Sequence, residues 1–136
     1  MYQRDYILNE ARKLAQLLAK LMGLKAEGAH EEYLVQFDKA LQNEYNVELD
    51  ELLQLSEQDF KEKMLQQTYS PEKLNALSKL LYVFAEPFEN DPKTKLTLKK
   101  ILILFDMMAD IHHTETFENI EKRKFIYRFL IQHERP

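Results

Sequence analysis

The chain of 136 residues contains no cysteine, only two glycines and only four prolines. Without thiols it cannot form a disulfide, a zinc–thiolate site or an iron–sulfur cluster. So few turn-forming residues argue against a β-sandwich, which needs a turn every ~8–12 residues. No stretch approaches the ~18 consecutive apolar residues of a membrane span, and the polar first ten residues do not resemble a signal peptide. We therefore expect a cytoplasmic protein that does not enter a membrane.

The composition of the chain predicts a single helical domain that covers residues 1–136. Hydrophobic residues make up 45% of the chain and aromatic residues 11%, which is enough to build a core. The charged fraction of 31% mixes both signs, and the net charge of −4 does not favour nucleic acid as a partner. Long segments rich in Leu, Lys, Glu, Gln and Ala are typical of helices.

Apolar residues recur at steps of three and four along most of the chain, which is the period of an amphipathic helix. Capping and breaking residues divide the pattern, because Ser70-Pro71 is a strong helix start and Pro87 ends a helix. The run ILILF at 101–105 resembles a strand, but the helical pattern continues on both sides of it for longer than a typical strand, so we predict a helix there. We predict an all-α fold of six or seven helices, over residues 3–26, 30–45, 49–55, 57–67, 71–86, 93–111 and 117–132.

Residues 14–45 read as a hairpin of two helices. Gly28 is the better candidate for its turn, although Gly23 could also end the first helix. The second helix opens with Glu31 and Glu32 and continues with Leu34, Phe37, Lys39, Ala40 and Leu41.

This hairpin resembles a single tetratricopeptide (TPR) unit, which is built from two antiparallel helices. Three features differ from that unit: Tyr33 replaces a small residue, Leu21 stands at the usual glycine, and no proline follows the second helix. Residues 72–111 look like a degenerate second unit, with Pro87 and Pro92 in the turn. The whole chain is also similar to small uncharacterised bacterial proteins that contain such a hairpin.

The resemblance implies a compact array of antiparallel helical hairpins. It also implies that the inner face of the hairpin holds a peptide, with Tyr33, Gln36, Asn43 and Tyr45 as its candidate residues. The competing interpretation places Tyr33 and Phe37 in the hairpin core.

Two polar groupings invite a search for chemistry. His112 and His113 lie near Glu115 and Glu118, but neighbouring histidines on a helix point about 100° apart, and the HExxH zinc pattern is absent. Asp106 and Asp110 lie one turn apart and could do acid–base work if they were buried together, but they fit the solvent side of an apolar helix better. We expect no enzyme activity, and no catalytic residue, metal ligand or cofactor.

The last helix carries more apolar residues than one face can hold. We therefore expect an interface at Phe125, Tyr127, Phe129, Leu130 and Ile131 that binds a protein partner or a second copy of the chain. The preferred function is a non-enzymatic interaction or scaffold module. The alternative is a small regulatory nucleic-acid-binding protein that uses basic clusters at 93–100 (Lys93, Lys95, Lys99 and Lys100) and at 122–128 (Lys122, Arg123, Lys124 and Arg128).

Overall fold

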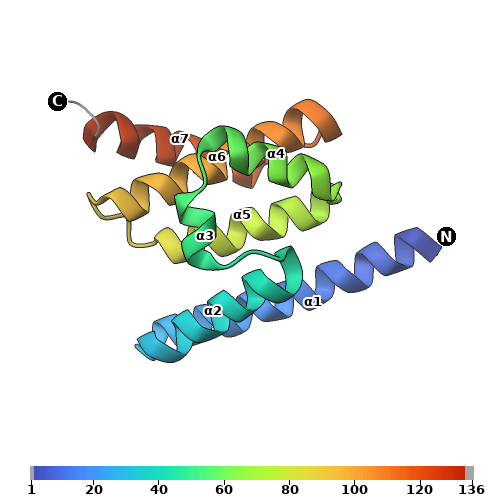
Figure 1. The fold of residues 1–136 in the computed structure, drawn as a ribbon, viewed down its shortest axis with the longest axis horizontal. Helices are drawn as coiled ribbons and strands as arrows, with labels where there is room; N and C mark the ends of the chain where they lie inside the picture. The colour runs from blue at the N-terminus through green and yellow to red at the C-terminus, as the bar shows by residue number, and fades with distance from the viewer. Residues whose placement is uncertain (1, 134–136) are drawn as a thin grey trace. The chain divides into compact units, whose positions relative to one another are not determined.

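A computed structural model describes residues 2–133 (Figure 1). In this range the chain forms seven helices and no strand, which confirms the all-α prediction. The helices are α1 (Tyr2–Ala26), α2 (His30–Tyr45), α3 (Leu49–Gln54), α4 (Glu57–Gln67), α5 (Pro71–Ala85), α6 (Pro92–His112) and α7 (Phe117–His133). None of these helices, as far as the structure describes them, is long and apolar enough to cross a membrane.

The chain divides into two compact units, residues 1–56 and 57–136. The expectation of a single domain over 1–136 stays a prediction. Each unit is described by itself below.

In the first unit α1 and α2 pack along one another as an antiparallel hairpin (Figure 1). Gly28 provides the turn with a φ of +77°, a conformation that side chains rarely adopt, whereas Gly23 lies inside α1. An ion pair of 2.8 Å between Lys13 Nζ and Glu44 Oε1 joins the two helices. The carboxylate of Asp38 accepts the backbone N–H of Leu49 at 2.8 Å, which fixes the start of α3.

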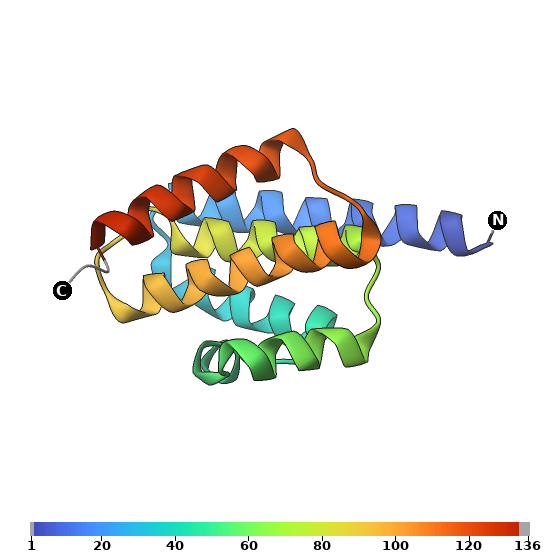
Figure 2. The same cartoon turned by 90° about the horizontal axis from the view of Figure 1, so that it is seen from above.

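The second unit is organised around α6, which contacts α4, α5 and α7 (Figure 2). Capping residues set its helix starts: the Ser70 hydroxyl accepts the N–H of Lys73, and the Asp91 carboxylate accepts the N–H of Thr94. Helix α6 is buried around most of its circumference. Its buried apolar residues are Leu98, Ile101, Leu102, Leu104, Phe105, Met107 and Met108. The ILILF segment is therefore the helical centre of this unit.

Candidate protein-binding surface

Helix α7 has one face fixed in the core of the second unit. Asn119, Ile126 and Leu130 are the buried residues of this inner face. The side-chain amide of Asn119 donates to Oδ1 of Asn75 on α5 at 2.8 Å. Arg123 pairs with Asp106 on α6 at 2.7 Å, so polar contacts to two helices set the rotation of α7 about its own axis.

An aromatic cluster covers one flank of α7. Phe88, from the loop between α5 and α6, lies at its centre and packs edge-on against Tyr82, Phe125 and Phe129, with ring centroids 5.3–5.5 Å apart. The ring of Phe129 also lies 4.4 Å from that of His133. These contacts pack Phe125 and Phe129 against their own unit, although Phe125 remains 54% exposed.

The opposite side of α7 carries a second line of residues, which we call the outer seam: Phe117, Ile120, Lys124, Tyr127 and Ile131. Their spacing of three, four, three and four residues is that of the a and d positions of a heptad. Phe117 is 78% exposed, Tyr127 43% and Ile131 57%, whereas Ile120 is half-buried. A shallow groove of about 730 Å³ lies along the C-terminal part of the seam and is lined by Lys124, Tyr127, Arg128, Ile131 and Gln132.

Charged side chains flank the outer seam. Lys124 Nζ lies 3.4 Å from Glu121 Oε1, one turn away, and Arg128 is exposed beside the seam. Partial burial works to lower the pKa of Arg123, but its contacts with Asp106 and Tyr127 outweigh burial and raise that pKa. The seam therefore combines four apolar residues with one lysine, Lys124, at its centre, and Glu121 and Arg128 lie beside it.

The structure divides the five residues that the sequence predicted as an interface. Tyr127 and Ile131 lie on the outer seam, Phe125 and Phe129 belong to the aromatic cluster, and Leu130 is buried in the core. Leu130 therefore offers no surface to a partner.

The sequence places the candidate surface between Phe117 and Ile131, but the five residues named for it do not include Phe117 and Ile120, which lie on the seam. The heptad spacing from Phe117 to Ile131 is the signal that would have found them.

Comparison of the chain with protein-family models, with curated proteins and with solved structures finds no match.

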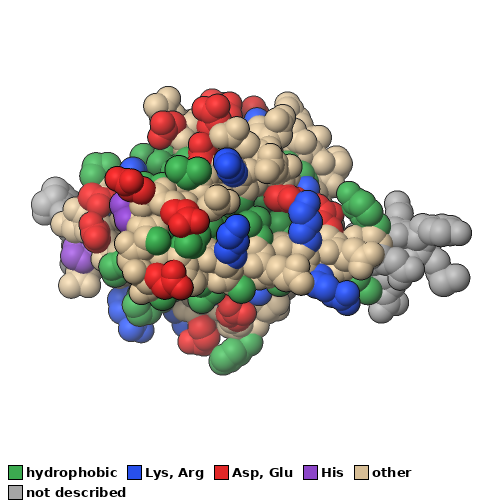
Figure 3. Space-filling view, turned by 90° about the horizontal axis from the view of Figure 1, so that it is seen from below, with side chains coloured by type: hydrophobic (Ala, Val, Ile, Leu, Met, Phe, Trp, Pro, Cys, Tyr) green, Lys and Arg blue, Asp and Glu red, His purple; other side chains and the backbone are tan. Residues whose placement is uncertain are grey.

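Several basic residues of the nucleic-acid alternative are engaged within their own unit, whereas Lys93, Lys124 and Arg128 are exposed. Lys100 is only 1% exposed and lies over the ring of Phe60, with Nζ 6.0 Å from its centroid, so it cannot reach a phosphate. Lys95 donates to the carbonyl of His133 at 2.8 Å, and Lys122 pairs with Glu118 at 2.9 Å. Figure 3 draws the side on which α1 lies, and acidic and basic side chains are interspersed there. The nucleic-acid alternative stays a prediction.

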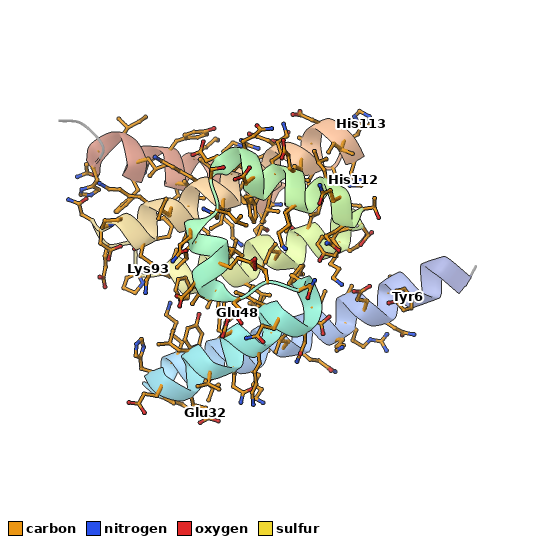
Figure 4. All side chains as sticks on the ribbon, viewed as in Figure 1. Tyr6, Glu32, Glu48, Lys93, His112 and His113 are labelled. Carbon is orange, nitrogen blue, oxygen red and sulfur yellow. The ribbon has the colours of Figure 1, made fainter. Side chains whose placement is uncertain are left out.

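The two polar groupings lie on the exposed side of α6 and at its C-terminal end. Asp106 and Asp110 are both exposed, as expected for the solvent side of α6, and Asp106 is engaged with Arg123. His112 and His113 lie at the C-terminal end of α6 (Figure 4), where the hydroxyl of Thr114 donates to the His112 carbonyl. Within residues 2–133 no group of three or more His, Asp or Glu side chains is placed to hold a metal ion.

The residues suggested for a peptide-binding inner face of the hairpin are partly unavailable. Tyr33 and Tyr45 are buried, as is Phe37, whose ring centroid lies 5.8 Å from that of Tyr33. Gln36 and Asn43 instead line a groove of about 580 Å³ between α1 and α2, together with Lys13, Gln16, Leu17, Lys20, Lys39, Ala40 and Glu44. Tyr33 and Phe37 thus fit the core interpretation.

Proposed function

We propose that this protein is a non-enzymatic protein–protein interaction module, acting in the cytoplasm, whose binding surface is the outer seam of α7. In this proposal the TPR-like hairpin of α1 and α2 is a structural support and not the peptide-binding element. The observation that carries the proposal is the exposed heptad line from Phe117 to Ile131 on a helix whose other face is already buried.

The chemistry of the seam supports this assignment. Exposed large apolar residues that occur singly are ordinary, but an aligned set along one helix face is typical of a binding surface. Tyrosine and arginine are enriched in interface centres, and both occur here as Tyr127 and Arg128. Because the inner face is held by Asn119 and Arg123, α7 presents the seam on a rigid helix.

Site-specific photocrosslinking tests the proposal. Benzoylphenylalanine at Tyr127 replaces one exposed aromatic residue by another, so the fold is preserved. The same probe at Tyr6, which is 69% exposed on α1, is the matched control. In cells, the probe at Tyr127 should give discrete adducts that Ile131→Lys removes, because a charge in the groove opposes an apolar contact. Equal adducts from both positions, or none from Tyr127, would contradict the proposal.

A further inference from the structure

Resting on the proposed function, we propose that the partner of the outer seam is the outer seam of a second copy of this chain, with the two α7 helices antiparallel. Residues at a and d positions form the interface through which helices associate in coiled coils. Three properties of α7 select the occupant and its direction: the residue at the centre of the seam, the charges beside it, and the length of the helix.

The centre of the seam disfavours a parallel pair. Lys124 occupies an a position, so parallel packing would place it against the partner's Lys124, and would bring Arg123 next to the partner's Arg128. Both contacts are between like charges. An antiparallel pair sets a positions against d positions, so that Lys124 faces the partner's Tyr127 and Ile120 faces the partner's Ile131. Lysine over an aromatic face is an attractive contact.

The flanking charges are complementary only in the antiparallel arrangement. With Lys124 opposite the partner's Tyr127, Glu121 lies beside the partner's Arg128, and the two-fold axis repeats this pair. Both residues are exposed in the single chain, and both occupy e positions, which form interhelical ion pairs in coiled coils. The surface is thus self-complementary, as the contact between two identical chains requires.

The length of α7 sets the strength of the pair. Residues 118–133 overlap in this register, about 24 Å of helix at 1.5 Å per residue. Two heptads per chain form an interface at the small end of specific complexes. The dimer is therefore concentration-dependent, and its Kd lies in the micromolar range or above.

Charge reversal across the two-fold axis tests the pairing. Sedimentation of the whole chain, over concentrations up to about 0.5 mM, should show reversible dimers for the wild type. Glu121→Arg alone, or Arg128→Glu alone, sets two pairs of like charges together and should weaken self-association about tenfold or more.

An equimolar mixture of the two single variants restores two opposite-charge pairs and should dimerise like the wild type, as should the double variant E121R/R128E. Both substituted positions are exposed, so unchanged helical circular dichroism is the control for folding. A wild type that stays monomeric overturns the inference, and so does a mixture that associates no better than its components.

Failure of the pairing is distinguishable from failure of the proposed function. If the probe at Tyr127 captures a different protein while the wild type is monomeric, the seam is a binding surface but its partner is not a second copy. If the probe captures nothing and no dimer forms, both fail.

Discussion

Replacing Lys100 by methionine should stabilise the protein. Lys100 is buried on α6, and its Nζ lies 6.0 Å from the centroid of the Phe60 ring. Burial lowers the pKa of Lys100 below its ordinary value of 10.5, and the charge of Glu57 only partly offsets this effect. Methionine keeps most of the buried stem and removes the charge.

The size of the effect follows from opposing terms. A buried ammonium group costs several kcal/mol of desolvation. A cation–π contact returns at most about 2 kcal/mol, and the attraction of Glu57 returns a further part. We expect Lys100→Met to raise the free energy of unfolding by about 1–3 kcal/mol at pH 7. For a unit of this size that corresponds to a rise in Tm of roughly 4 °C per kcal/mol.

The dependence on pH has a definite sign. Below the lowered pKa, Lys100 is charged in both the folded and the unfolded chain, and the full cost of burial applies. As pH rises from that pKa towards 10.5, the folded chain has lost the proton and the unfolded chain still binds it, so the wild type gains stability with pH. The advantage of the methionine variant should therefore shrink between neutral pH and pH 10.5.

Urea unfolding followed by circular dichroism, at pH 7 and near pH 10, measures this advantage. Lys93→Met, at an exposed position of the same helix, is the control and should change stability by less than about 0.5 kcal/mol. A methionine variant less stable than the wild type at pH 7, or a difference that does not vary with pH, would show that the buried charge of Lys100 does not destabilise the fold.

Three further predictions concern stability and are checked by urea or thermal unfolding. Gly23→Ala should stabilise the protein by about 0.5–1 kcal/mol, because this glycine lies inside α1 with nothing within 4 Å of an added methyl group. Gly28→Ala should destabilise it by about 1 kcal/mol, because the φ of Gly28 is +77°. Equal effects of the two substitutions would contradict a left-handed turn at Gly28. Tyr33→Phe should be neutral or stabilise by up to about 1.5 kcal/mol, because the hydroxyl is buried without a hydrogen-bond partner; a clear loss would reveal a partner. Phe88→Ala should cost about 2–4 kcal/mol by removing the centre of the aromatic cluster, with Phe88→Leu costing less; a loss below about 1 kcal/mol would show that the three ring contacts contribute little.

The sequence was sufficient to place every described helix within about two residues of its observed limits. This succeeded because the start and stop signals are local. The Ser70 cap, the break at Pro87 and the turn at Gly28 act through neighbouring backbone groups, and each is found where the sequence indicates.

The candidate surface could be predicted only in part, because its residues depend on how α7 is rotated. This helix carries apolar residues on more than one face, so periodicity alone does not say which face is buried. Lys100 is a second example. As part of the basic cluster at 93–100 it was interpreted as a surface cation, but it is buried in the core. Both outcomes are decided by neighbouring helices and not by local sequence.

The hydrogen bond between Asn119 and Asn75 favours one of two possible rotations of α7 against the rest of its unit, the one that buries Ile126 and Leu130. If α7 were rotated so that the outer seam was buried instead, apolar contacts would still form. The part-buried hydrogen bond between the two amides would then be lost. Burying a polar pair often costs stability and gains a unique arrangement. Here the gain is that one apolar face of α7 is assigned to folding, which leaves the other available for association.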